Sequence, residues 1–254
     1  MKKESSLKEF FTKNNQAALA FSGGVDSSYL LYAALKLGAD VQPYYVKSAF
    51  QPAFEYEDAC HLADSLGVKL KVIEVNILEE RQVTANPQNR CYFCKNKIFN
   101  TIIQEAAKDG YQLILDGTNA SDDAHDRPGM KALSELKVRS PLRECGLTKD
   151  IIRGLSKEAG LFTWNKPSYA CLATRISTGE EITRDKLTTT ERAEEYLFSL
   201  GFENFRIRLF KGLARIQLTE KQIPLFMQKR EEILKQLKTE YAGAVLDLEV
   251  RDEQ

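Results

Sequence analysis

The first 120 residues alternate short apolar runs with segments of helical periodicity. The apolar runs have the length of buried strands and are bounded by polar or turn-forming residues. They span residues 17–21, 41–46, 69–75 and 112–117. Apolar residues at helical spacing extend from Ser27 to a stop at Gly38 and recur over 53–67. Because alternating strands and helices form βαβ units, we predict an α/β fold with a doubly wound parallel sheet, covered by helices on both faces.

The pattern changes beyond Gly179. The elements expected there are, in chain order, a helix at 184–200, strands at 205–210 and 213–218, one long helix at 221–239 and a strand at 244–250. The turn at Lys211-Gly212 favours an antiparallel pair of strands. We therefore predict two domains, a main domain over 1–178 and a small C-terminal α+β domain over 179–254.

Composition narrows the class of partner. The chain has 254 residues, and its 36 basic side chains balance 36 acidic ones, so no global field attracts a polynucleotide. We expect neither a nucleic acid nor a membrane partner, since no apolar segment approaches transmembrane length and the N-terminus has no apolar leader. The cysteines, odd in number, favour a reducing cytoplasmic location in which thiols serve chemistry or metal binding. They are Cys60, Cys91, Cys94, Cys145 and Cys171.

Small, hydroxylated and glycine residues fill the turn between the first strand and its helix. This SGGVDS loop consists of Ser22, Gly23, Gly24, Val25, Asp26 and Ser27. Backbone N–H groups and the helix dipole bind anions at such a junction, and glycines let phosphate approach the backbone. Asp26 adds a carboxylate for Mg²⁺, which prefers oxygen ligands shared with phosphates. No lysine follows, so the loop is not a Walker A motif.

A second polar segment, from Asp116 to Asn119, follows the fourth strand. Because ligands bind beyond the carboxyl ends of parallel strands, we expect this segment and the SGGVDS loop at one rim of the sheet. The sequence therefore predicts a site for nucleotide phosphates at that rim. The alternative is a serine-glycine turn that only connects a strand to a helix.

Cys91 and Cys94 lie at the start of an expected helix, spaced so that both sulfurs share one helical face. The helix N-terminus, Arg90 and Lys95 favour thiolates. The spacing fits zinc, an iron–sulfur cluster, a redox dithiol or chance. Together with Cys171 the pair offers three thiolates, which suit an iron–sulfur cluster with one open iron or zinc with a water ligand.

The remaining cysteines and both histidines are expected to be inert. Cys60 falls inside the helix expected at 53–67 and Cys145 lies in a loop, and we interpret both as small buried hydrophobic residues. His61 and His125 are isolated along the chain, and a solvated helix surface suits His61.

Three segments together resemble one protein family. The SGGVDS loop, RCYFCK at 90–95 and KPSYACLATR at 166–175 resemble the LarE-type ATP-dependent sulfur transferases of the PP-loop ATP pyrophosphatase superfamily. The resemblance implies an adenine nucleotide α hydrolase-like domain that releases pyrophosphate and AMP. It also implies a substrate, pyridinium-3,5-biscarboxylic acid mononucleotide, whose adenylated carboxylate would receive sulfur to give the thiocarboxylate of the nickel-pincer cofactor.

Several binding residues follow from the resemblance. The loop from Ser22 to Ser27 would bind ATP and Mg²⁺, with Asp26 as a metal ligand. Arg206 and Arg208 resemble the family's phosphate-binding arginines; the alternative is a solvated face of a strand. The family further implies a homo-oligomer that acts on a small, nucleotide-like substrate.

The resemblance also assigns the sulfur chemistry. Cys171 matches the catalytic cysteine that, in one branch of the family, gives up its own sulfur and becomes dehydroalanine. In the other branch three cysteines bind a 4Fe–4S cluster whose open iron carries the sulfide. Cys91, Cys94 and Cys171 are all present, so we predict the cluster. Thr174 stands where the family often has serine, and the turn after it lacks the family's aromatic residue.

Other functions remain open from the sequence. A tRNA thiolase would share the SGGVDS loop and the cysteine pair but would need a basic surface. An amidotransferase-type synthetase would need a source of ammonia, and no glutaminase segment is visible. A non-catalytic nucleotide or iron–sulfur sensor would keep the fold without forming AMP.

Overall fold

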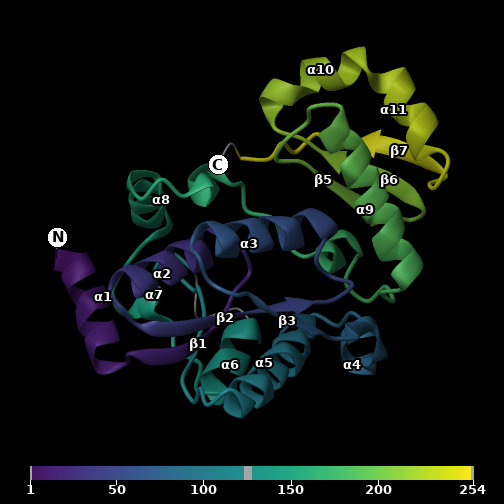
Figure 1. Ribbon diagram of the computed structural model, residues 1–254. Helices are drawn as coiled ribbons and strands as arrows, with labels where there is room; N and C mark the ends of the chain where they lie inside the picture. The colour runs from purple at the N-terminus through teal and green to yellow at the C-terminus, as the bar shows by residue number, and fades with distance from the viewer. Residues whose placement is uncertain (1, 123–127, 253–254) are drawn as a thin grey trace. The chain divides into compact units, whose positions relative to one another are not determined.

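The computed structural model describes residues 2–122 and 128–252. The chain forms two compact units, both drawn in Figure 1. Unit 1 comprises Met1–Ile77 and Asn89–Lys166, and unit 2 comprises Leu78–Gln88 and Pro167–Gln254. The domain boundary after residue 178 stays a prediction. Among the described residues, no helix is both long and apolar enough to cross a membrane.

Unit 1 is built on a four-stranded parallel sheet. Its strands are β1 (Gln16–Ala20), β2 (Asp40–Lys47), β3 (Lys71–Glu74) and β4 (Ile114–Leu115). Their order is β3-β2-β1-β4, and every neighbouring pair is parallel. β2 and β3 lie on one side of β1, whereas β4 lies on its other side. The predicted α/β fold with a parallel sheet is confirmed, although β3 and β4 are shorter than the apolar runs that predicted them.

Helices cover both faces of this sheet (Figure 1). They are α1 (Lys2–Lys13), α2 (Val25–Lys36), α3 (Ala53–Ser65), α5 (Arg90–Lys108), α6 (Pro128–Glu135), α7 (Pro141–Glu144) and α8 (Lys149–Glu158). Side chains alternate across β1, because Ala17 and Leu19 pack with α1, α2, α3, α7 and α8, whereas Ala18 packs with α5 and α6. This alternation forms two hydrophobic cores, one on each face of the sheet.

Unit 2 contains a three-stranded sheet of β5 (Arg206–Phe210), β6 (Leu213–Gln217) and β7 (Gly243–Leu246). The predicted antiparallel pair is confirmed for β5 and β6, and β7 runs parallel to β6. Lys211 and Gly212 both have positive φ, at 51° and 80°, which matches the twist of a two-residue hairpin.

The helices of unit 2 are α4 (Arg81–Thr84), α9 (Arg184–Ser199), α10 (Ile223–Gln228) and α11 (Arg230–Leu237). The prediction of one long helix over 221–239 is wrong. A 3₁₀ turn (Glu220–Gln222) precedes α10, and Lys229 leaves helical geometry at φ −95° and ψ 5°. Pro224 stands in the first turn of α10, where the absence of its N–H costs no helical bond. The apolar faces of α10 and α11 thus pack on one core as two short helices.

A buried ion pair fastens the elements of unit 2 together. Arg175 ends the short 3₁₀ turn η3 (Leu172–Arg175), and its Nε donates to Oε1 of Glu194 on α9 at 2.7 Å. The side chains are 0% and 2% exposed. The same Oε1 accepts the backbone N–H of Ile207 on β5 at 3.0 Å. One carboxylate therefore joins a turn, a helix and a strand.

We predict that Glu194→Ala destabilises the protein strongly, because it leaves the Arg175 guanidinium buried without its carboxylate. Removal of one partner from a buried pair costs about 3–5 kcal/mol. For a chain of this size, that corresponds to a melting temperature lowered by roughly 6 °C or more. Glu195→Ala is the matched control, since it removes the next, exposed carboxylate of α9. Equal melting temperatures for the two variants would contradict the role given to Glu194.

Candidate active site

The SGGVDS loop leaves the carboxyl end of β1 and enters α2. Gly23 has φ +70°, and a Cβ atom there would lie 3.0 Å from the Cβ of Ala59 on α3, so any other residue would be strained. The Oγ atoms of Ser22 and Ser27 are 3.1 Å apart and close the loop on itself. Among the described residues no side chain caps α2 at Gly24. The first N–H groups of α2 are therefore donors suited to an anion.

The helix begins earlier than the sequence predicts. α2 starts at Val25 and not at Ser27, so Asp26 lies in the first helical turn. This places its carboxylate at the positive end of the helix dipole, beside the N–H groups that would bind phosphate.

The segment after β4 approaches the same helix end, as expected for neighbouring parallel strands. A Cβ atom on Gly117 would lie only 2.9 Å from the backbone nitrogen of Ser27. Asp116 is buried, and its Oδ1 accepts hydrogen bonds from Ser140 Oγ at 2.6 Å and from Thr118 N at 3.3 Å. The predicted rim is confirmed, because both loops meet where β1 and β4 end.

Asp26 pairs with Lys149 and, among the described residues, keeps one oxygen free of hydrogen bonds. Lys149 Nζ lies 2.6 Å from Asp26 Oδ2. The other oxygen, Oδ1, is buried and accepts no hydrogen bond from any residue that the structure describes. Burial raises the pKa of Asp26, and the attraction of Lys149 opposes this only in part. An unpartnered carboxylate oxygen beside a phosphate cradle fits a Mg²⁺ ligand.

The cysteine pair lies at the start of α5, as predicted. Cys91 is exposed, Cys94 is half-buried, and the Cys91 Sγ lies 3.9 Å from a guanidinium nitrogen of Arg90. Cys171 is half-buried and belongs to unit 2. Within residues 2–122 and 128–252, no group of three or more His, Cys, Asp or Glu side chains is arranged to hold a metal ion.

The residues expected to be inert have ordinary surroundings. Cys60 and Cys145 are half-buried, and burial raises the pKa of the Cys145 thiol, which disfavours a reactive thiolate. His61 stacks on Phe162 with ring centroids 4.8 Å apart. His125 lies outside the described residues.

Cys171 is followed by a short, strongly braced segment. The backbone N–H and hydroxyl of Thr174 both donate to the carbonyl oxygen of Cys171, at 2.9 and 2.8 Å. Arg175 Nη1 donates to the carbonyl of Ala170 at 3.0 Å and to Thr174 Oγ1 at 2.8 Å. The buried guanidinium thus fixes the backbone on both sides of the cysteine.

Arg206 and Arg208 both donate hydrogen bonds to acceptor atoms of the protein itself. Arg206 is buried and donates to the carbonyls of Ser168 and Phe205, and its guanidinium lies 5.0 Å from the centre of the Tyr169 ring. Burial, followed by the nearby arginines, lowers the pKa of Arg206 to about 10. Arg208 is half-buried and donates to Gln217 Oε1 at 2.9 Å. Phosphate binding by the two arginines stays a prediction.

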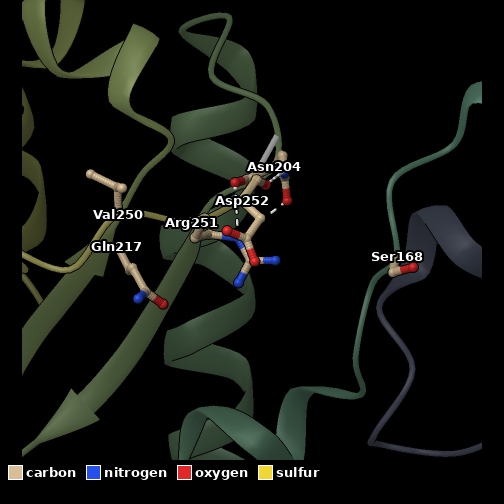
Figure 2. A pocket seen from close by; sticks show the side chains of 6 residues that line it. All are labelled: Ser168, Asn204, Gln217, Val250, Arg251 and Asp252. Atoms are coloured by element: carbon tan, nitrogen blue, oxygen red, sulfur yellow. Dashed lines mark hydrogen bonds between the residues drawn. The ribbon is translucent and has the colours of Figure 1, made fainter. Parts of the chain in front are cut away.

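A polar cavity of about 250 Å³ lies within unit 2 (Figure 2). Its lining residues are Ser168, Asn204, Gln217, Val250, Arg251 and Asp252. Arg251 Nε donates to the backbone carbonyl of Asn204 at 3.0 Å and to its side-chain oxygen at 3.2 Å. Ser168 and Gln217 are the residues that accept hydrogen bonds from Arg206 and Arg208. The predicted arginines therefore bind to the wall of this cavity.

Sequence reasoning missed three residues of these sites. Lys149 has no predicted role in the sequence analysis, although a lysine in a first helical turn opposes the helix dipole, and that conflict is a signal of a role beyond helix stability. Glu194 interrupts the buried face of α9, which is a signal of a buried charge pair. Arg251 lies near the end of the chain and gives no local signal.

Comparisons with known proteins agree with the resemblance. A family model described as queuosine biosynthesis protein QueC matches residues 16–125. An uncharacterized protein of Synechocystis sp. is 39% identical over 89% of this chain and 85% of its own length. The pyridinium-3,5-bisthiocarboxylic acid mononucleotide synthase of Lactiplantibacillus plantarum is 32% identical over 93% of this chain and 87% of its own length.

A more distant relative performs sulfur chemistry on RNA. The tRNA-specific 2-thiouridylase MnmA 1 of Clostridium botulinum is 27% identical over 59% of this chain and 51% of its own length. The synthase of L. plantarum matches nearly the whole chain at higher identity, and the QueC model covers the segment that carries the SGGVDS loop. The chain therefore belongs to the LarE family of ATP-dependent sulfur transferases, within the PP-loop superfamily.

Proposed function

We propose that this protein adenylates a carboxylate of pyridinium-3,5-biscarboxylic acid mononucleotide and then replaces a carboxylate oxygen by sulfur. The relative in L. plantarum, whose name gives the bisthiocarboxylic product, supports this substrate. The observation that carries the proposal is the SGGVDS loop at the end of β1. There the start of α2 has no side-chain cap and Asp26 keeps an unpartnered oxygen, among the described residues.

The first step uses unit 1. A carboxylate oxygen of the substrate attacks the α-phosphorus of ATP, and the bond to pyrophosphate breaks with its electron pair on the leaving group. The N–H groups at the start of α2 stabilise the charge on pyrophosphate. Asp26 Oδ1 would hold Mg²⁺, which when bound neutralises charge on the phosphates. The products of this step are an acyl-adenylate and pyrophosphate.

The second step uses the thiol of Cys171. Its thiolate attacks the carbonyl carbon of the acyl-adenylate, and AMP leaves with the bonding pair, which gives a thioester. Removal of the Cα proton at position 171 then breaks the Cβ–Sγ bond, and the sulfur leaves as a thiocarboxylate. The side chain becomes dehydroalanine, so the atoms balance without an external oxidant or reductant. Arg175 fixes the backbone that carries this cysteine.

An iron–sulfur cluster on Cys91, Cys94 and Cys171 is the alternative source of sulfur. The cysteine pair on α5 has suitable spacing, and Cys171 would supply the third thiolate that a cluster needs. The steps above describe the route that uses Cys171 alone, and the cluster stays a prediction from the sequence.

We predict that Asp26→Asn lowers the rate of pyrophosphate release by about 100-fold or more, because the variant loses the charge that would hold Mg²⁺. The rate is measured with ATP and the mononucleotide. Asp64→Ala, which removes an exposed carboxylate from α3, is the control and should keep the full rate. Formation of ADP and phosphate by the unmodified protein would contradict the PP-loop assignment.

Mass spectrometry of the intact protein separates the two sources of sulfur. On the sacrificial route, one turnover removes about 34 Da, the mass of H₂S, from position 171. Cys171→Ser should still release pyrophosphate but form no thiocarboxylate, and Cys60→Ser should behave as the unmodified protein does. Unchanged mass over several turnovers, with iron and sulfide bound to anaerobically purified protein, would contradict the sacrificial route and support the cluster.

Arg208→Ala is predicted to weaken binding of the mononucleotide and not of ATP. A charge-assisted hydrogen bond to phosphate contributes about 1.5–3 kcal/mol, so the KM for the mononucleotide should rise roughly tenfold or more. Arg192→Ala removes an exposed arginine of α9 and serves as the control. An unchanged KM in Arg208→Ala would show that this arginine only binds Gln217.

A further inference from the structure

The two oxygens of the Asp26 carboxylate have different surroundings. Oδ2 pairs with Lys149 Nζ at 2.6 Å, whereas Oδ1 is buried and has no hydrogen-bond donor among the described residues. A buried acceptor without a partner is costly, and native structures keep few of them. The geometry therefore divides the carboxylate into one oxygen that is anchored and one that is open to a ligand.

Lys149 reaches Asp26 from a rigid position. It is the first residue of α8, and its backbone N–H donates to Ser121 Oγ at 3.0 Å. α8 packs against α2, which carries Asp26. A lysine in the first turn of a helix opposes the helix dipole, so this position is a poor choice for helix stability alone.

A purely stabilising ion pair does not account for this arrangement. The side chains of Lys149 and Asp26 are 27% and 20% exposed, and partly exposed pairs contribute little stability. A pair formed only for stability would also gain from a donor to Oδ1, which the described residues do not supply. The effect of Lys149 on the charge of the site matters more than its effect on stability. Its positive charge cancels the negative charge of Asp26 at the place where a cation would bind.

We propose that Lys149 is a positioning residue that anchors Asp26 Oδ2, leaves Oδ1 for the divalent cation, and makes the site select the cation–nucleotide complex over the free cation. The inference rests on the proposed ATP-dependent function. A neutral Asp26–Lys149 pair attracts a free divalent cation weakly, whereas the negative phosphates of ATP supply the missing charge. Mg²⁺ sites of this kind combine one or two carboxylates with substrate phosphates.

Binding measurements by calorimetry on the full chain test this inference without turnover. The probes are Mn²⁺ alone and the Mg²⁺ complex of α,β-methylene-ATP, which cannot release pyrophosphate. In Lys149→Met, we expect the analogue complex to bind about tenfold more weakly, because Asp26 is no longer held in place. We expect Mn²⁺ alone to bind several-fold more tightly, because the carboxylate is no longer neutralised.

Two further variants keep the result interpretable. Lys149→Arg restores a cation near Oδ2 and should recover most of the selectivity for the analogue complex. Lys157→Met removes an exposed lysine from the same helix and should bind both probes as the unmodified protein does. Melting temperatures of all variants show whether each one is folded.

The outcomes separate this inference from the proposed function. If the unmodified protein binds the analogue complex but Lys149→Met binds either probe as the unmodified protein does, the role of Lys149 is wrong and the nucleotide site stands. If the unmodified protein does not bind the analogue complex at all, the proposed function and this inference both fail.

Discussion

The close contact between the segment after β4 and the first turn of α2 is the constraint on which the proposed nucleotide site depends. In this parallel sheet β2 and β4 lie on opposite sides of β1. The loops that follow β1 and β4 therefore meet at one rim of the sheet. The 2.9 Å separation between a Gly117 Cβ and the Ser27 nitrogen leaves no room for any other residue at position 117. Gly23 has a positive φ, and a Cβ atom there would lie 3.0 Å from Ala59 on α3, so a substitution there is strained too. Two glycines thus bring backbone close to the helix end that would bind pyrophosphate.

Unit 2 holds Cys171, which is half-buried, in a segment that other side chains brace. The Arg175–Glu194 pair anchors η3 to α9 and β5, and Nη1 of Arg175 donates to Ala170 and Thr174 on either side of Cys171. The Tyr169 ring lies against the guanidinium groups of both Arg175 and Arg206, at 4.6 and 5.0 Å. Burying an ion pair costs desolvation free energy, but the buried pair holds this short polar segment in one conformation.

The sequence predicts the elements of this fold well where the pattern is local. Apolar runs located all four strands of unit 1, and the glycine loop located the start of α2 to within two residues. The prediction of one long helix at 221–239 was wrong because the helical spacing of apolar residues continues through Lys229, whereas the backbone leaves helical geometry there. The cysteine pair was placed correctly at the start of α5 because its helical spacing is local.

Contacts between distant parts of the chain lay beyond that reasoning. The pairing of Lys149 with Asp26 joins residues that neither periodicity nor composition links, and the same holds for Arg175 with Glu194. Arg251 reaches the cavity of unit 2 because it pairs with Thr219, which follows β6. Such residues are specified by packing, so a single sequence signals them only where a charge breaks an apolar face or opposes a helix dipole.

Anaerobic incubation with ATP, Mg²⁺ and pyridinium-3,5-biscarboxylic acid mononucleotide, followed by mass spectrometry of the small molecules, tests the central claim most directly. The account predicts a product in which sulfur has replaced one carboxylate oxygen, formed together with one pyrophosphate and one AMP. Conversion of ATP to AMP and pyrophosphate without sulfur in the product would contradict it.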